Sequence, residues 1–277
     1  MGLKIATNIA SLAVQKNLSQ SNNDIKNEID KLSSGKRVSS AADDAAGLAL
    51  ATKFEASVRS MRQAKRNAGD GKSLIQTAEG ALNESSSIMM RMRELSVQSS
   101  SDTLGEAERE MVDREYQQLL DEVDRIAAST EFNGINVLDG QSDGVLDIQV
   151  GINSGEENAI QFDPGVTDAT TSSLGIEGSG VSQKEDAWDA MGAIDEAMDS
   201  LSNQRAELGA LQNRMDITQN NLETQILNTE EAKSNIQDTD YAESSAKLAS
   251  AKLKQNAGIS VLAQANQVSS RVLKLIG

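Results

Sequence analysis

Histidine and cysteine are absent from the sequence. These two residue types supply most of the general bases, nucleophiles and zinc ligands that enzymes use. Carboxylate pairs remain as a catalytic alternative, but most Asp and Glu residues fall on the polar faces of predicted helices, where contact with solvent is their usual role. We therefore expect no catalytic residue, no metal site and no cofactor, and we expect that the protein is not an enzyme.

Aromatic residues and proline are scarce. Aromatics form 2% of the 277 residues, and Pro164 is the one proline. A rounded core uses large rings to fill its volume, whereas a core of Ala, Leu, Ile, Val and Met suits thin bundles of long helices. The composition therefore favours a mainly α protein built as a long-helix coiled-coil bundle.

Long hydrophobic runs are missing too. No segment approaches the roughly 18 consecutive apolar residues of a membrane span, so we expect no membrane insertion. The first residues also lack the charged region, apolar region and cleavage site of a secretory signal. Both observations fit a cytoplasmic protein or one that is exported without cleavage of a signal.

Charge is distributed unevenly along the chain. Residues 244–277 contain five Lys or Arg and no Asp or Glu, and residues 1–37 contain six Lys or Arg against three acidic residues. The whole chain has a net charge of -16, so residues 38–243 hold -24. Two mildly basic ends and an acidic middle lack the dominant basic face of a nucleic-acid binder, so we expect no nucleic-acid partner.

Both ends of the chain have apolar residues at helical spacing. Near the start, Ile5, Ile9 and Leu12 are separated by steps of four and three, and a second series begins at Leu18. A single helix cannot bury such a stripe and is marginal alone. We therefore expect both ends to need a partner for their stripes, to be available to pair with each other and to mediate self-assembly. The predicted self-assembly residues are Ile5, Ile9, Leu12, Leu18, Ile25, Ile29, Leu32, Val261, Ala265, Val268, Val272 and Leu275.

The middle of the chain has further helical stripes and one change of period. The predicted helices span residues 44–100, 105–128 and 183–232. Between them, Leu146, Ile148, Val150 and Ile152 alternate with polar residues. Period 2 with turn residues on either side is typical of a β-hairpin, so we expect a small β-hairpin region over residues 130–182.

Several segments resemble bacterial flagellins. The block LSSGKRVSSAADDAAGLALATKFEASVR (residues 32–59) is similar to the most recognisable part of that family. EVDRIAASTEFNGINVLDG resembles the stretch that leads into the family's β region, and the last 43 residues resemble its C-terminal end. The matches are collinear over residues 1–140 and about 185–277, which makes the resemblance highly specific.

The resemblance implies a domain organisation and a function. Residues 1–43 and 236–277 would form the two halves of an inner-core coiled-coil domain, and residues 44–235 a rod-like outer-core domain. The chain would be a structural subunit that polymerises into the flagellar filament, the propeller for swimming motility. It would be secreted through the flagellar type III export apparatus and located outside the cell.

The resemblance also implies partners. Beside other copies of itself, the chain would meet a filament cap protein, a hook–filament junction protein and a flagellin export chaperone. The junction protein has related ends and is therefore the alternative function for this chain. The blocks SAADDAAGLAL and VLAQANQ favour flagellin over the junction protein.

One further site is implied by the resemblance alone. The helix patch that the animal flagellin-sensing Toll-like receptor recognises falls, by position, on Arg91, Leu95 and Glu115, with Met90 and Gln98 beside them. The competing interpretation is that these residues make contacts between subunits. Both interpretations can hold, because the resemblance implies that the patch is buried in the polymer.

Overall fold

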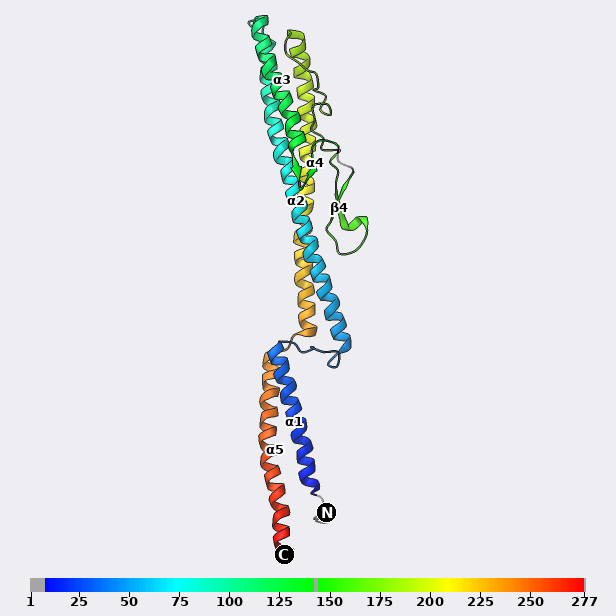
Figure 1. Cartoon of the computed structure of the whole chain (residues 1–277), viewed down its shortest axis with the longest axis vertical. Coiled ribbons are helices and arrows are strands. Elements are labelled where there is room, and N and C mark those ends of the chain that lie inside the picture. Colours follow the sequence, from blue (N-terminus) through cyan, green and yellow to red (C-terminus); the bar gives the residue numbers. More distant parts are fainter. Residues whose placement is uncertain (1–7, 142–143, 277) are drawn as a thin grey trace. The chain divides into compact units, whose positions relative to one another are not determined.

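The computed structural model describes residues 8–141 and 144–276, with the side chains of residues 268–276 outside the description. Most of these residues are helical, and the expected mainly α fold is confirmed (Figure 1). The helices are α1 (Ile9–Ser34), α2 (Ala45–Ser99), α3 (Glu106–Ser129), α4 (Lys184–Gln237) and α5 (Tyr241–Ile276).

The chain packs as two compact units. Unit 1 comprises residues 1–58 and 228–277, and unit 2 comprises residues 59–227. The division into an inner core of residues 1–43 with 236–277 and an outer core of residues 44–235 stays a prediction.

Local signals fix both ends of α1. The Asn8 side chain accepts a hydrogen bond from the backbone N–H of Ser11 at 3.1 Å, which satisfies a free donor of the first turn. At the other end, Gly35 adopts a left-handed conformation with φ 70°, and its N–H bonds to the carbonyl of Lys31. A glycine takes this conformation without steric cost, so it ends the helix.

In unit 1, the segment that follows α1 and the segment that precedes α5 run antiparallel and are joined by hydrogen bonds. The backbone N–H of Arg37 donates to the carbonyl of Gln237 at 2.7 Å, and that of Thr239 donates to Gly35 at 3.0 Å. The Arg37 guanidinium also donates to the carbonyl of Ile236 at 2.7 Å, near the end of α4. The segments that leave α1 and enter α5 are therefore joined by backbone pairing.

The helical stripe predicted along α2 forms the core of unit 2. Leu74, Ala78, Met92 and Leu95 are buried, and they belong to one continuous apolar cluster with side chains of α3 and α4. Ser85, which lies seven residues after Ala78 and seven before Met92 on the same helical spacing, is buried as well. The helix predicted over residues 183–232 continues further, to Gln237.

Two small antiparallel hairpins complete unit 2. The expected one pairs β3 (Leu146–Gln149) with β4 (Ala159–Phe162), and Val150 and Ile152 lie beyond its first strand. A short 3-10 helix, η1 (Glu156–Asn158), precedes β4. The second hairpin, β1 (Glu131–Phe132) with β2 (Ile135–Asn136), was not expected.

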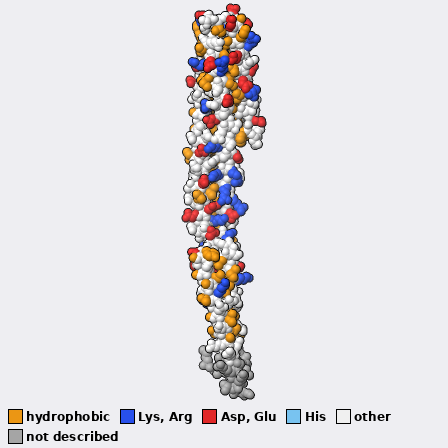
Figure 2. All heavy atoms as spheres, turned by 90° about the vertical axis from the view of Figure 1, so that its left-hand side faces the viewer, with side chains coloured by type: hydrophobic (Ala, Val, Ile, Leu, Met, Phe, Trp, Pro, Cys, Tyr) orange, Lys and Arg blue, Asp and Glu red, His pale blue; other side chains and the backbone are white. Residues whose placement is uncertain are grey.

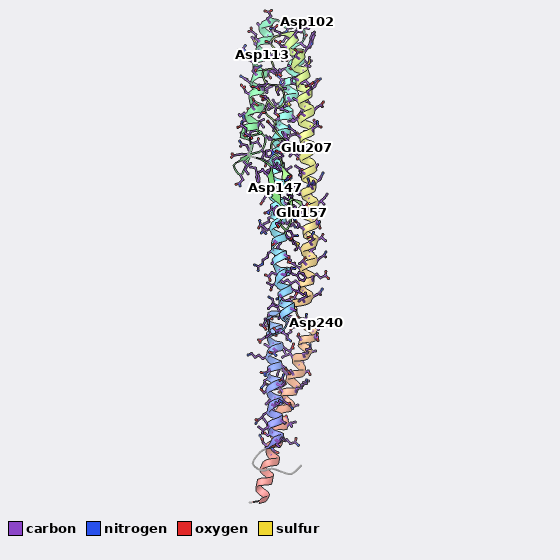
Figure 3. All side chains as sticks on the ribbon, turned by 90° about the vertical axis from the view of Figure 1, so that its right-hand side faces the viewer. Asp102, Asp113, Asp147, Glu157, Glu207 and Asp240 are labelled. Carbon is purple, nitrogen blue, oxygen red and sulfur yellow. The ribbon has the colours of Figure 1, made fainter. Side chains whose placement is uncertain are left out.

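Residues 165–182, which precede α4 and are rich in Gly, Ser and Thr, pack against α3. Asp124 accepts hydrogen bonds from the backbone N–H and the hydroxyl of Thr171, both at 2.8 Å. The first half of α3 contributes Asp113, labelled in Figure 3, which accepts from the N–H of Val181 at 2.7 Å. Because Ile176 is also buried, this stretch belongs to the core rather than to an open loop.

Candidate interaction surfaces

In unit 1, α1 and α5 pack against each other along their length (Figure 1). The two helices are antiparallel, because Asn8 contacts Ala265 whereas Ser21 contacts Ala251. The least exposed positions alternate steps of three and four, as in a coiled coil. On α1 they are Ser11, Val14, Leu18, Ser21, Ile25, Glu28 and Leu32; on α5 they are Ser244, Leu248, Ala251, Gln255, Gly258, Leu262 and Ala265.

The contact between these helices is rich in small and polar residues. The Ser21 hydroxyl donates to the backbone carbonyl of Ala251 at 2.9 Å. The Ser11 hydroxyl donates to the side-chain oxygen of Asn266 at 3.1 Å, and Ser11 and Ser21 are both buried. Such directional bonds fix the register of the pair, while small side chains let the backbones approach closely.

This arrangement corrects the expectation that a continuous apolar stripe pairs the two ends. Leu18, Ile25, Leu32 and Ala265 do lie half-buried in the contact. Ile9, Leu12, Ile29 and Val261 are instead exposed. Ile5 and the side chains of Val268, Val272 and Leu275 lie outside the described residues. The physical reason is that small residues such as Ser11, Ser21 and Ala251 take some of the positions next to the partner helix, so several larger side chains face away.

Large apolar side chains are therefore exposed on unit 1. Leu253 is 70% exposed, Ile9 65% and Leu12 56%. Figure 2 shows hydrophobic side chains at the surface of this helix pair. Exposed apolar surface of this kind occurs at protein–protein contacts, so unit 1 is the best candidate for a self-assembly surface.

In unit 2, Arg91 joins α2 to α3. Its guanidinium donates to Glu115 at 2.8 Å and to Glu94 at 3.0 Å, and these hydrogen bonds, chiefly the one to Glu115, raise the pKa of Arg91 above its ordinary value. Met90 and Gln98 are exposed on the same helix. The structure thus presents four of the five predicted receptor-contact residues at the surface.

Leu95 is the exception in that set. Its side chain is 1% exposed and belongs to the core of unit 2. This position continues the apolar stripe of α2, so the side chain packs against the other helices and is not offered to a partner. Its place in the predicted receptor site is corrected accordingly.

Across residues 8–141 and 144–276, no helix combines the length and hydropathy needed to cross a membrane.

Paired terminal helices, a helical core and exposed apolar side chains define this chain as a helical structural subunit with a candidate assembly surface at its ends. Two family models match it: the bacterial flagellin N-terminal helical region over residues 5–143 and the bacterial flagellin C-terminal helical region over residues 191–276. The chain belongs to the bacterial flagellin family.

Similar proteins extend over nearly the whole chain. A flagellin of Halalkalibacterium halodurans is 40% identical, with 97% of this chain and 98% of the relative covered. A flagellar filament core protein of Brachyspira hyodysenteriae is 38% identical, with 98% of this chain and 99% of the relative covered.

Solved structures agree with the fold. The crystal structure of Bacillus cereus flagellin is 30% identical with a TM-score of 0.50, covering 57% of this chain and 88% of that chain. A putative flagellar hook-associated protein from Vibrio parahaemolyticus has a TM-score of 0.59 at 14% identity. The match covers 71% of this chain and 100% of that chain. At that identity the likeness concerns the fold alone, so it does not favour the junction-protein alternative.

Proposed function

We propose that this flagellin joins its filament through the exposed apolar side chains of the α1–α5 pair. The chain is a structural subunit that polymerises into the bacterial flagellar filament, and its family is structural rather than enzymatic. The observation that supports the proposed surface is the exposure of Ile9, Leu12 and Leu253 on the paired ends. A monomer that exposes such residues gains free energy when another copy covers them.

The free energy gained by burying these side chains is sufficient for subunit addition. Burying one Leu or Ile side chain contributes about 1.5–3 kcal/mol, so covering several supplies on the order of 10 kcal/mol before the cost of lost translational, rotational and side-chain freedom is subtracted. A filament also requires two different patches on each copy, because a self-complementary patch closes into a dimer.

We further propose that residues 1–43 with 236–277 act as the inner core of the filament and residues 44–235 as its outer core. We also propose that the chain leaves the cell by type III export and assembles outside the cell. An export chaperone, the filament cap protein and the hook–filament junction protein are the partners that this route requires. All of these rest on the family resemblance.

Deletion of residues 244–277 tests the assembly surface. Without most of α5, α1 loses its partner helix and the chain loses Leu253 and Ile259. We expect a soluble monomer that electron microscopy never finds in filaments, whereas the full chain polymerises under the same conditions. Filaments of normal appearance from the shortened chain would contradict the proposal.

The second surface concerns the animal flagellin-sensing Toll-like receptor. We propose that Met90, Arg91, Gln98 and Glu115 contact it in the monomer. Arg91→Ala and Glu115→Ala should each weaken signalling in a receptor-reporter assay. Arg125→Ala is the matched control, because Arg125 makes a comparable exposed ion pair with Glu122 at 2.6 Å, ten residues beyond Glu115 on α3. Equal signalling by all variants would refute receptor contact.

A further inference from the structure

A groove of about 450 Å³ lies between α1 and α5 on one flank of the helix pair. Its apolar lining consists of Val14 and Leu18 from α1 together with Ala257, Gly258 and Val261 from α5. Leu18 and Gly258 face each other, since a Cβ atom at position 258 would lie 3.4 Å from Cδ1 of Leu18. Because Gly258 has no side chain, the groove keeps its depth at this level.

Ile259 projects from the other flank of the pair at the same level. Successive residues of an α-helix are rotated by about 100°, so Ile259 is turned by roughly 200° from both Ala257 and Val261. Those two residues line the groove. The Ile259 side chain is 53% exposed. One flank therefore offers an apolar hollow and the opposite flank an apolar projection.

Charged residues accompany both features. Asp24 lies on the rim of the groove, six residues after Leu18 on α1. Lys252 is exposed two helical turns before Ile259 on the projecting flank, and within the described part of the chain it makes no ion pair. Because α1 and α5 are antiparallel, Lys252 and Asp24 lie at similar levels on opposite flanks. The groove is lined by Lys254 as well as Asp24, so it offers one carboxylate to a lysine that enters beside the projection.

We propose that Ile259 of one subunit inserts into the α1–α5 groove of a second copy of this chain, with Lys252 of the first beside Asp24 of the second. The proposal rests on the filament function stated above and names the contact that joins neighbouring copies. Since hollow and projection lie on different flanks, each copy receives one neighbour and enters another. Such a contact does not close on a pair and generates an open array of subunits.

Disulfide trapping tests this contact directly. The chain has no cysteine, so introduced pairs have no background. Asn17 lines the groove and is exposed. Filaments of the Ile259→Cys/Asn17→Cys variant, oxidised and run without reductant, should give a ladder of covalent dimers, trimers and longer oligomers. A disulfide requires Cβ atoms about 3.5–4.5 Å apart, so only direct neighbours will be linked.

The controls fix the interpretation of the ladder. Either single variant should stay monomeric, and Ile259→Cys/Asn23→Cys should give less than a tenth of the cross-linked product, because Asn23 is exposed and lies outside the groove. Filaments without a ladder would overturn the contact and leave the filament function standing. Dimers from Ile259→Cys alone would show a self-complementary contact instead. Absence of filaments from the unaltered chain would contradict the proposed function itself.

Charge exchange provides a second measurement for the case in which the cysteine variants do not polymerise. Lys252→Glu should raise the critical concentration for assembly severalfold, and adding Asp24→Lys should restore most of the loss. Lys16→Glu, which alters an exposed lysine outside the groove, is the matched control for net charge. A double variant that assembles less well than Lys252→Glu alone would overturn the proposal.

Discussion

Ser21 of α1 and Ala251 of α5 are joined by a buried hydrogen bond, in which the serine hydroxyl donates to the alanine carbonyl at 2.9 Å. The two residues are 230 positions apart in the sequence. A small hydroxyl at this point allows close approach of the helices and specifies one register. The pairing of the chain ends thus includes small polar contacts beside apolar ones, and it leaves large apolar side chains such as Ile9, Leu12 and Leu253 exposed.

Replacing that hydroxyl should weaken the helix pair measurably. Ser21→Ala removes the donor, and because the Ala251 carbonyl keeps its place in the α5 ladder, we expect a loss of about 0.5–1.5 kcal/mol in the free energy of unfolding. Urea unfolding of the monomer, followed by circular dichroism, measures it. Ser19→Ala on the exposed face is the control and should change stability by less than about 0.5 kcal/mol. Equal effects would mean that the hydrogen bond contributes nothing.

Leu95 and Met90 should separate core packing from surface contact on α2. Leu95→Ala leaves a cavity in the core of unit 2 and should cost about 2–5 kcal/mol of unfolding free energy. Met90→Ala alters an exposed side chain and should stay within about 0.5 kcal/mol. Denaturant unfolding of both variants checks the difference. If Met90→Ala proved the more destabilising, the assignment of Leu95 to the core would be wrong.

The sequence predicts unit 2 better than unit 1, for a physical reason. In α2 the buried positions are filled by residues such as Leu74, Met92 and Leu95, so hydrophobic periodicity identifies them. In the α1–α5 pair, Ser11 and Ser21 are buried and form hydrogen bonds to α5. Because serine is polar, a hydrophobicity pattern does not identify these positions as buried. The step of seven between Leu18, Ile25 and Leu32 was the available signal. This seven-residue spacing predicts the face of α1 that contacts α5, provided that Ser, Ala and Gly are accepted as contact residues.

The β1–β2 hairpin was missed for a different reason. Its strands have two residues each, too few to show a period of 2. Asn133-Gly134 is a sequence signal for a turn, and the structure gives both residues positive φ, 54° and 78°. Two central residues of positive φ are what a type I′ hairpin turn requires. The turn chemistry was therefore sufficient evidence for a hairpin, although the strand pattern was not.

Two glycines should respond to alanine with opposite signs. Gly134→Ala forces a Cβ-bearing residue into φ 78° and should cost roughly 1–2 kcal/mol, although no atom lies within 4 Å of the added Cβ. Gly80→Ala, inside α2 and also in open space, should stabilise by about 1 kcal/mol, because alanine favours the helix. Thermal unfolding of both variants is the measurement. Destabilisation by Gly80→Ala would reveal a contact at that position.

Asp43 should make the loop before α2 sensitive to acid. Its carboxylate accepts hydrogen bonds from the backbone N–H of Ser40 at 2.9 Å, from the Ser40 hydroxyl at 3.0 Å and from Ser39. These bonds, chiefly the one from the Ser40 backbone, lower the pKa of Asp43 below its ordinary value. The charged form is therefore favoured in the folded state. Its contribution to stability is fully present above pH of about 3.9, the ordinary aspartate pKa, and is lost as the pH falls through the lower folded pKa.

Asp43→Asn tests this dependence because it keeps the shape and removes the charge. At pH 7 the variant should melt at a lower temperature than the unaltered chain, since its amide oxygen is a weaker acceptor. Below pH of about 3.9 the two melting temperatures should converge, because the wild-type carboxylate is then being protonated. Asp30→Asn, at an exposed position on α1, is the control for the loss of one negative charge. A gap between Asp43→Asn and the unaltered chain that stays constant from pH 7 to pH 2 would show that the charge of Asp43 has no role in holding the loop.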